Sequence, residues 1–543
     1  MKNLVFIAIL LFAAVTLNAQ TPEIMWSYDT YDASFGQSAA GDIDGDGKLE
    51  VVFGCYRNDS SVYALNLEDG TLLWKVNTRY PGYEGCNDVA PLIYDVDGDG
   101  VLDVIVPSSC NPTTYCFNGP DGEIKWQTPT SGSDSPPTIS DIDGDGDMEI
   151  MHGGFDGHVM CLNAIDGNVE WSLAVDEDSW VQTAPTIVDL DGDGLIDFVV
   201  ASEKSDTNRV YAYKGIDHTP LWQYTMADWV YHGTAVADLD QDGKPELVLG
   251  DYEGNLVALN GEDGSEAWTY TYSTSGGYYV GSPATIADLD GDGHCELVFC
   301  NWFKIIALRD DGTMFWNYSI PDYETAFRGA VLSDVDNDGL PDAVFGTSGG
   351  LVMALSGLDG SLLWSVDLQT HYGMTFPIDH APVIADFDGD GGLDLFIVGG
   401  HAEYPDFFND YGRAYALSIG QGTGPDWLMF QNNIHRTGSI CETSVSVNEN
   451  IKQQAFASIN VYPNPFAGSV NIEIFNPQKT DVKIEISDIY GRLVNSTGFA
   501  ENGQDFFSFK WNGENQEGSI IPAGMYFLKV KCSGVVLTNK ILK

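Results

Sequence analysis

The residues with the clearest chemical potential are acidic, and they recur in one nine-residue pattern. Asp–apolar–Asp–x–Asp–Gly–x–x–Asp/Glu begins at Asp42, Asp95, Asp141, Asp189, Asp238, Asp288, Asp334 and Asp386. Carboxylates at positions 1, 3 and 5 alternate along a tight turn, glycine at position 6 permits the bend, and another acid stands at position 9. With the backbone carbonyl of position 7, these groups form a set of hard oxygen ligands that suits Ca²⁺ better than Mg²⁺ or a transition metal.

The sequence therefore predicts up to eight calcium sites with five ligand residues each. In chain order the ligand residues are Asp42, Asp44, Asp46, Lys48, Glu50; Asp95, Asp97, Asp99, Val101, Asp103; Asp141, Asp143, Asp145, Asp147, Glu149; Asp189, Asp191, Asp193, Leu195, Asp197; Asp238, Asp240, Asp242, Lys244, Glu246; Asp288, Asp290, Asp292, His294, Glu296; Asp334, Asp336, Asp338, Leu340, Asp342; and Asp386, Asp388, Asp390, Gly392, Asp394. A single copy could be a solvated Asp/Gly turn, but eight copies in register with the strand pattern favour metal binding. EF-hands are excluded, because the last acid stands at position 9 rather than 12.

The charge of the chain agrees with cation binding. With 80 acidic and 24 basic residues in 543, the net charge is −56, which argues against nucleic acid or an anionic membrane as a partner. A halophilic surface would also be acidic. The concentration of acids in the repeated loops favours bound cations instead.

The segments around each loop predict short β-strands. A β run follows each loop, as at 49–54, and then come a second strand, an Asp-Gly turn and a third strand that contains tryptophan. A fourth strand leads to the next loop, and the loops begin 46 to 53 residues apart. Four short strands in a repeat of this length indicate β-propeller blades. The predicted fold class is all-β: an eight-bladed β-propeller with calcium-binding loops, followed by a small C-terminal β-sandwich.

The closure of the ring is open from sequence alone. Trp26 resembles the tryptophan of a third strand, and Trp427 is predicted to hold the equivalent position in the last repeat. The segment 24–28 could complete the last blade or only cover its edge.

The loops and the strands after them resemble FG-GAP/VCBS repeats, as in the propellers of integrin α-chains, whose calcium loops have this spacing. The Tyr-Ala-Leu-Asn-x-x-Asp-Gly-x-x-x-Trp segments, such as 63–74, also resemble PQQ-like propeller repeats. Together the two resemblances cover roughly residues 24–440. We expect no quinone cofactor, because the chain has no vicinal Cys-Cys pair and no residue set that suits the cofactor.

Both ends of the chain resemble targeting segments. Residues 1–19 predict a signal peptide with an apolar run at 4–15 that is too short to span a bilayer. After a propeller at 20–440, residues 441–459 predict a linker and 460–543 a domain of alternating strands. Its segments 461–466, 488–492 and 522–526 resemble the type A sorting domain of the type IX secretion system, whereas an ordinary adhesive sandwich is the alternative. The resemblance implies a Bacteroidetes-type bacterium, export across the outer membrane, interaction with the secretion machinery, and removal of this domain, often with attachment to the cell surface.

Nine cysteines in an exported chain permit disulfides but leave at least one cysteine without an intrachain partner. Cys86 and Cys110 would lie at matching ends of neighbouring strands, which makes them the preferred bridge. Free buried cysteines are the alternative.

We expect the ligand to bind on the propeller face opposite the calcium loops, where the loops are rich in aromatic residues that could stack on a glycan or pack against a protein. The predicted ligand-binding residues are Tyr231, His232, Tyr278, Trp302, Tyr323, Arg328, Tyr372 and Tyr404. Packing between blades is the rival interpretation, especially for Trp180, Trp229 and Tyr279, each nine residues before its loop. The resulting prediction is a secreted or surface-attached binding, adhesion or structural module.

Catalysis is the alternative function. Some polysaccharide lyases are calcium-rich propellers, and a lyase would need a base on the aromatic face, for which Arg328, His232 and His371 are the candidates. The clustered carboxylates are already assigned to metal, so the sequence offers no evident acid/base pair. No transmembrane segment and no catalytic residue set is predicted.

Overall fold

The computed structural model describes two parts of the chain. These are residues 21–441, apart from 81, 83, 88, 204–207, 232, 273–278 and 404–408, and residues 458–543, apart from 463–465, 467, 476–481, 489–491, 500–505, 517–518, 523 and 533–534. The predicted signal peptide and most of the predicted linker lie outside the described residues. The chain forms two compact units, Met1–Val447 and Asn448–Lys543.

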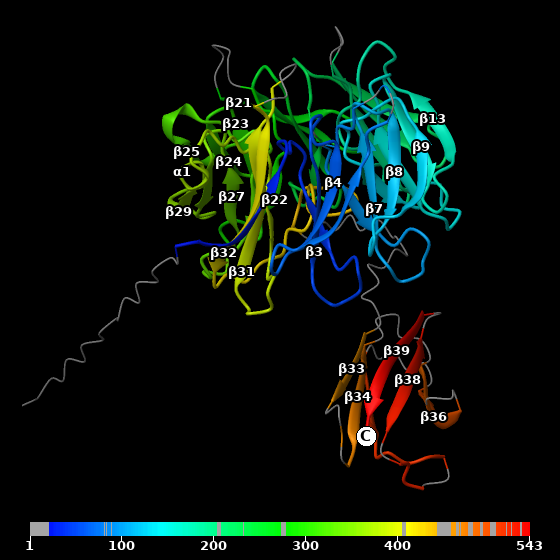
Figure 1. Ribbon diagram of the computed structural model, residues 1–543. Helices are drawn as coiled ribbons and strands as arrows, with labels where there is room; N and C mark the ends of the chain where they lie inside the picture. Colours follow the sequence, from blue (N-terminus) through cyan, green and yellow to red (C-terminus); the bar gives the residue numbers. More distant parts are fainter. Residues whose placement is uncertain are drawn as a thin grey trace, which may run out of the picture. The chain divides into compact units, whose positions relative to one another are not determined.

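The larger unit contains eight four-stranded antiparallel sheets among its described residues, here numbered first to eighth in the order of the acidic loops (Figure 1). In order, they comprise β2 (Ala39–Gly41), β3 (Glu50–Gly54), β4 (Ser61–Asn66) and β5 (Leu72–Asn77); β6 (Leu92–Tyr94), β7 (Asp103–Ser108), β8 (Thr113–Asn118) and β9 (Ile124–Pro129); β10 (Thr138–Ser140), β11 (Glu149–Gly153), β12 (His158–Asn163) and β13 (Val169–Ala174); β14 (Thr186–Val188), β15 (Asp197–Ala201), β16 (Arg209–Lys214) and β17 (Pro220–Thr225); β18 (Ala235–Ala237), β19 (Glu246–Gly250), β20 (Asn255–Asn260) and β21 (Glu266–Thr271); β22 (Thr285–Ala287), β23 (Glu296–Asn301), β24 (Lys304–Leu308) and β25 (Met314–Ser319); β26 (Val331–Ser333), β27 (Asp342–Gly346), β28 (Leu351–Leu355) and β29 (Leu362–Asp367); and β30 (Val383–Ala385), β31 (Leu393–His401), β32 (Tyr411–Gly420) and β1 (Glu23–Thr30).

The antiparallel order of each sheet separates its connections onto two faces. Each acidic loop joins the first and second strands, and in the first seven sheets a tight turn, Asp-Gly in most of them, joins the third and fourth strands, so both connections lie at the same end of the sheet. The other two kinds of connection lie at the opposite end. A short helix α1 (Leu368–Tyr372) and a 3₁₀ turn at Pro321–Tyr323 belong to these opposite connections.

Hydrophobic cores join the sheets in a ring, because neither face of a four-stranded sheet can be buried by that sheet alone. Separate buried clusters link the first sheet to the second, the second to the third, and so on to the eighth. A further cluster joins the eighth sheet back to the first through residues such as Phe396 and Phe53. This closed arrangement is a β-propeller.

The N-terminal strand closes the ring. β1 pairs antiparallel with β32 and forms the fourth strand of the eighth sheet, so the edge of β32 is paired rather than exposed. Of the two possibilities for segment 24–28, the structure therefore has the one in which it completes the last blade.

A tryptophan on the outermost strand joins each of six sheets to the next one. This strand is the fourth of the sheet and the third when counted from the acidic loop. The indole Nε1 of Trp74, for example, donates to the backbone oxygen of Gly119 at 2.6 Å, and Trp26, Trp126, Trp222, Trp268 and Trp316 make the same bond to the following sheet. The indole also lies against the glycine of the next Asp-Gly turn. A Cβ atom added at Gly122 would come within 2.7 Å of the Trp74 ring, and Gly122 has φ of +69°. The repeated Asp-Gly and Trp motifs of the sequence thus contact each other between neighbouring blades.

The prediction for Trp427 is wrong. Its backbone pairs with Ile384 on β30, the innermost strand of the eighth sheet, and its side chain is 1% exposed. Because β1 supplies the fourth strand of the eighth sheet and Trp26 supplies the tryptophan of that strand, residues 421–441 do not belong to any blade. We call this segment the axial strap.

The axial strap makes polar contacts with the innermost strand, or with a residue directly next to it in the chain, in every sheet. It bonds through its backbone to Asp334, Ile384, Ala40, Ile187, Val236 and Ile286, which belong to the seventh, eighth, first, fourth, fifth and sixth sheets. The fully buried Arg436 reaches the other two, donating to the carbonyl oxygens of Pro91 at 3.2 Å and Pro137 at 3.0 Å. Since innermost strands line the axis of a propeller, the strap lies in its central channel.

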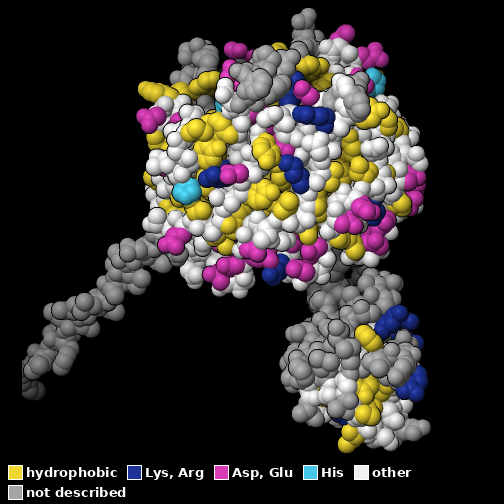
Figure 2. Space-filling view, viewed as in Figure 1, with side chains coloured by type: hydrophobic (Ala, Val, Ile, Leu, Met, Phe, Trp, Pro, Cys, Tyr) yellow, Lys and Arg dark blue, Asp and Glu magenta, His cyan; other side chains and the backbone are white. Residues whose placement is uncertain are grey.

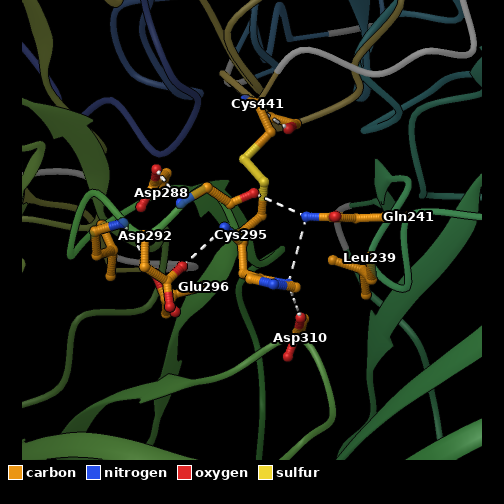
Figure 3. The surroundings of a disulfide bond; sticks show 12 residues. Leu239, Gln241, Asp288, Asp292, Cys295, Glu296, Asp310 and Cys441 are labelled. Carbon is orange, nitrogen blue, oxygen red and sulfur yellow. Dashed lines mark hydrogen bonds and ion pairs between the residues drawn. A yellow bond between two sulfur atoms is a disulfide. The ribbon is translucent and has the colours of Figure 1, made fainter.

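Two disulfides are present in the described residues. Cys86–Cys110 confirms the preferred bridge. Cys295–Cys441, which the sequence analysis did not predict, joins the end of the axial strap to the sixth acidic loop (Figure 3). Cys55, Cys116, Cys161 and Cys300 are free and buried.

The smaller unit is also all-β. Its two sheets comprise β33 (Ser458–Tyr462), β34 (Val470–Phe475) and β37 (Phe506–Trp511), and β36 (Leu493–Phe499), β35 (Val482–Asp488), β38 (Met525–Cys532) and β39 (Val535–Leu542). Ile472 on the first sheet and Ile484 and Leu528 on the second belong to one buried cluster. Two sheets that share a core in this way form a layered β arrangement.

Replacing Arg436 with methionine tests the importance of the axial strap. The change leaves three backbone carbonyls without their donor, those of Pro91, Pro137 and Phe430, so we expect the free energy of unfolding to fall by about 3 kcal/mol or more. Chemical denaturation measures it. Arg413→Met is the control, because it removes an ion pair to the exposed Asp29 and cation–π contacts with Tyr372 and Tyr415, which together should cost about 1 kcal/mol. Equal losses in the two variants would contradict the role given to the strap.

Candidate metal centres and an aromatic surface

Backbone N–H groups orient the carboxylates of each acidic loop. In the first loop, Gly47 N donates to Asp42 Oδ2 at 3.1 Å and Lys48 N donates to Asp46 Oδ1 at 2.9 Å. The acid at position 9, Glu50, accepts from Ile43 N at 2.9 Å. The equivalent position-9 bond occurs in the third to eighth loops, at Glu149, Asp197, Glu246, Glu296, Asp342 and Asp394. In the first loop, one oxygen of each of these carboxylates accepts an N–H group, which leaves the other oxygen available to a ligand. In the second, fourth, sixth, seventh and eighth loops, both oxygens of the position-1 aspartate accept N–H groups, as those of Asp95 do from Gly98 and Gly100.

Position 4 of every loop has a left-handed backbone conformation. It is glycine in six loops, as at Gly45 with φ of +77°, and Gln241 (φ +61°) and Asn337 (φ +63°) in the fifth and seventh. From the sequence, only the glycine at position 6 was assigned a role in bending the loop. The glycine at position 4 was a visible signal for the second bend, which lets the chain fold back around one point.

The carboxylates at positions 1, 3 and 9 converge. In the first five loops, one oxygen from each lies within 4.8 Å of the others, and three further groups that could hold a metal occur among the described residues. The position-5 acids do not belong to these five groups of three. Their Oδ1 atoms accept the backbone N–H of position 7 instead, as Asp145 does from Asp147 at 2.9 Å. The structure therefore brings together three of the five predicted ligand positions and holds position 5 beside them.

Buried oxygens without a hydrogen-bond donor point to a cation. Asp42 Oδ1, Asp141 Oδ1 and Asp197 Oδ1 are buried and have no hydrogen-bond partner. An uncompensated buried carboxylate is costly, and hard divalent cations compensate it. The donor set, which is oxygen alone, fits Ca²⁺.

Burial raises the pKa of the acid at position 9. The pKa of Glu149 rises to about 8, and those of Glu50, Asp197 and Glu246 rise to about 7, mainly through desolvation. The charges of neighbouring acids raise them further: Glu170 and then loop aspartates for Glu149, and loop aspartates for the other three. Near neutral pH these acids are therefore protonated in a substantial fraction of metal-free loops, and a cation must displace those protons.

On the opposite face, aromatic side chains from the fifth, sixth and seventh sheets form one continuous patch, which we call the aromatic patch. Ring centroids lie 6.4 Å apart for Tyr231–Tyr252, 5.0 Å for Tyr252–Tyr279, 4.3 Å for Tyr279–Trp302 and 6.0 Å for Tyr279–Phe327. Arg328 Cζ lies 5.9 Å from the Tyr231 ring. All these side chains are half-buried, so they pack on one another and also face solvent.

The structure brings together some of the predicted ligand-binding residues and separates others. Tyr231, Trp302 and Arg328 belong to the aromatic patch. Tyr323 is 79% exposed and packs edge-on against Phe303, whereas Tyr372 on α1 stacks on Tyr411, with Arg413 4.8 Å from its ring. His232, Tyr278 and Tyr404 lie outside the described residues.

Sequence reasoning missed Tyr252, which lies centrally in the patch. It occupies the β19–β20 turn, as Trp302 occupies the β23–β24 turn, and this shared place was the available signal. The equal spacing of Trp180, Trp229 and Tyr279 has a backbone cause. Each residue bonds through its main chain to the turn of its own sheet, at Glu203, Tyr252 and Trp302.

The surroundings of the aromatic patch are acidic. Burial raises the pKa of Tyr231, and the charges of Asp134 and Glu203 raise it further, while Arg328 lowers it. Burial likewise raises the pKa of Asp379, against the nearby charge of Arg328. Figure 2 shows that Asp and Glu outnumber Lys and Arg on the visible side of the larger unit.

Family models match two parts of the chain. The FG-GAP-like repeat matches residues 42–106, 95–152, 189–249 and 238–299, and the secretion system C-terminal sorting domain matches residues 460–543. The chain thus carries FG-GAP-like repeats and a type IX sorting domain, as the sequence predicted. Among the described residues, no helix has the length and apolar character needed to span a membrane.

The chain is also similar to individual proteins. It is 26% identical over 266 residues to the outer membrane protein assembly factor BamB of Yersinia pestis, covering 48% of this chain and 61% of that protein. It is 24% identical over 408 residues to the rhamnogalacturonan exolyase YesX of Bacillus subtilis (strain 168), covering 66% and 59%. The chain thus spans about three fifths of the length of both relatives. The V. cholerae biofilm matrix protein Bap1 shares the fold, with a TM-score of 0.56, 16% identity, and 77% of this chain and 96% of that chain covered.

Replacing Glu149 with glutamine should remove metal binding at the third loop. The variant loses one of three converging charges, so we expect one calcium fewer per chain by isothermal titration calorimetry, and a lower melting temperature in calcium. Glu177→Gln is the matched control, since this exposed acid follows β13 at the end of the same sheet opposite the loop. Equal calcium numbers in the two variants would contradict the assignment.

Calcium affinity should fall as pH falls from 8 to 5.5, because binding must displace protons from acids such as Glu149 and Glu50. The folding stability of the metal-free protein should change in the opposite direction and increase as pH falls. The folded-state pKa is raised, so the stabilisation is complete below about pH 4.5 and is lost as pH rises through about 7 to 8. Titrations in buffers of different ionisation enthalpy measure the released protons. No proton release at pH 7 would contradict the prediction.

Proposed function

We propose that this FG-GAP-like propeller, which its sorting domain directs across the outer membrane to the cell surface or the extracellular space, is a calcium-stabilised module that binds an uncharged glycan. The observation that carries the proposal is the aromatic patch, which spans three neighbouring sheets on the face opposite the acidic loops.

The chemistry of the patch suits a sugar. Half-buried rings such as Tyr252 and Trp302 offer apolar faces to the C–H groups of a pyranose, and their packing against Tyr279 fixes their orientation before binding. Polar groups at the edge, including Arg328 and Asp379, can hydrogen-bond to hydroxyl groups. A few polar groups around an apolar platform are typical of small-ligand sites.

The charge of the patch favours an uncharged ligand. Asp134, Glu203 and Asp379 act electrostatically on Tyr231 or Arg328, and Arg328 is the one basic residue that contacts the patch rings in the described residues. A polyuronate would meet these acids and a chain of net charge −56. A neutral polysaccharide avoids this repulsion.

Calcium would act on the structure rather than on the ligand. The acidic loops lie at the ends of the sheets opposite the patch, so bound Ca²⁺ would hold the first two strands of each sheet together at their far ends. The residues that would hold it are the converging acids at positions 1, 3 and 9.

A polysaccharide lyase is the second candidate, and the similarity to a rhamnogalacturonan exolyase favours it. Of the three predicted bases, Arg328 lies in the patch, whereas His371 contacts Tyr415 in a separate cluster and His232 is outside the described residues. A lyase acts beside a carboxylate of its substrate, which the surrounding acids disfavour.

A polysaccharide screen with the full chain tests both candidates. We expect retention on a neutral glycan without new unsaturated ends, and about tenfold weaker binding for Trp302→Ala and Tyr252→Ala through lost stacking. Tyr372→Ala is the control, because Tyr372 stacks on Tyr411 in another cluster. Unsaturated ends, detected by ultraviolet absorbance and abolished by Arg328→Ala, would establish the lyase instead. Glycan binding unchanged in both patch variants would exclude the patch as the site.

A further inference from the structure

Basic side chains enter two of the acidic loops at bonding distance. Lys125 Nζ on β9 lies 2.6 Å from Asp97 Oδ2 and 2.9 Å from Asp103 Oδ2, which are positions 3 and 9 of the second loop. Lys214 Nζ on β16 lies 2.8 Å from Asp191 Oδ2 and 2.6 Å from Asp193 Oδ2, positions 3 and 5 of the fourth loop. Each ammonium therefore bridges two predicted calcium ligands.

Two other loop lysines lie differently. Lys48 and Lys244, at position 7 of the first and fifth loops, direct Nζ to Glu68 at 2.7 Å and Glu262 at 2.5 Å. Neither acid is a predicted ligand. Arg309 beside the sixth loop is intermediate, since it is 3.5 Å from Asp290 and Glu296 and lies over the Phe315 ring.

We propose that Lys125 and Lys214 are built-in counter-cations that weaken calcium binding at the second and fourth loops, so that the propeller has two classes of calcium site. This inference rests on the proposed calcium binding and adds the residues that divide the loops.

The reason is competition for the same oxygens. Calcium would bind carboxylate oxygens at about 2.3–2.6 Å, so an ammonium within 3 Å of two of them occupies nearly the same place. The lysine must move away before the metal enters, and its positive charge then remains close to the ion. Both lysine side chains are partly buried, with 21% and 27% exposed, which limits where they can go.

The second and fourth loops are weakened rather than closed to metal. Asp103 Oδ1 and Asp197 Oδ1, on side chains 0% and 1% exposed, have no hydrogen-bond partner. The lysine thus leaves a buried oxygen in each loop uncompensated, and this oxygen still favours a divalent cation at higher concentration. At low calcium, the ammonium reduces the repulsion among the converging acids, which keeps these two loops formed.

Calorimetric titration of the calcium-depleted full chain tests the proposal. We expect the double variant Lys125→Met/Lys214→Met to bind two more calcium ions in the tight class than the unaltered chain, with affinity at these loops raised at least tenfold. Lys48→Met/Lys244→Met is the matched control, because it removes the same charge from loops whose lysines contact only Glu68 and Glu262. This control should keep the original number of tight sites.

A crystal structure of the unaltered chain grown at limiting calcium provides a second measurement that needs no variant. Calcium density in the first and fifth loops, with none in the second and fourth, would support the proposal. Equal occupancy in all four loops, or equal titrations for both double variants, would overturn it. Absence of calcium binding at every loop would instead overturn the underlying proposal that these loops hold calcium.

Discussion

The contact between an outer-strand tryptophan and the Asp-Gly turn of the next sheet sets the geometry of the propeller. The indole of Trp74 needs a turn without a side chain at Gly122, and Gly122 needs a left-handed conformation that glycine adopts without strain. In the fourth sheet, His218 with φ of +59° replaces the glycine, and Trp171 lies 4.1 Å from its ring. Since the contact fixes how neighbouring sheets stack, it also places all acidic loops on one face and the aromatic patch on the other.

The net charge is distributed unevenly between the two units of the chain. Residues 448–543 contain nine acidic and nine basic residues, so the whole net charge of −56 belongs to residues 1–447. Within that part, acids converge in threes at distances that would be repulsive without a cation. Protonation of buried acids such as Glu149, the lysines at the second and fourth loops, and bound metal are three ways to reduce this repulsion. They compete, and the balance depends on pH and on calcium.

Local repeats made most of the fold predictable, and long-range single contacts did not. The acidic loops, the strands after them and the Asp-Gly turns follow from sequence periodicity, because each repeat meets the same neighbours. Trp427 was misassigned because it follows the last repeat at the usual distance. The fourth strand of the eighth sheet, where such a tryptophan would lie, is β1 instead. The axial strap, Cys295–Cys441 and the central position of Tyr252 depend on residues far apart in sequence, which no period reveals. Within the acidic loops, positions 1, 3 and 9 were predictable from spacing, whereas the contacts of Lys125 and Lys214 required the strand register.

The Cys295–Cys441 disulfide has a mechanical consequence. The chain continues toward the C-terminal unit directly after Cys441, so a pull on that unit reaches Cys441 before any other part of the axial strap. The covalent bond carries this force to Cys295, which directly precedes β23 of the sixth sheet (Figure 3). Without the bond, the same pull would open the hydrogen bonds of the strap one at a time from its end. The disulfide thus transfers the load from the individual hydrogen bonds of the strap to a paired sheet of the propeller.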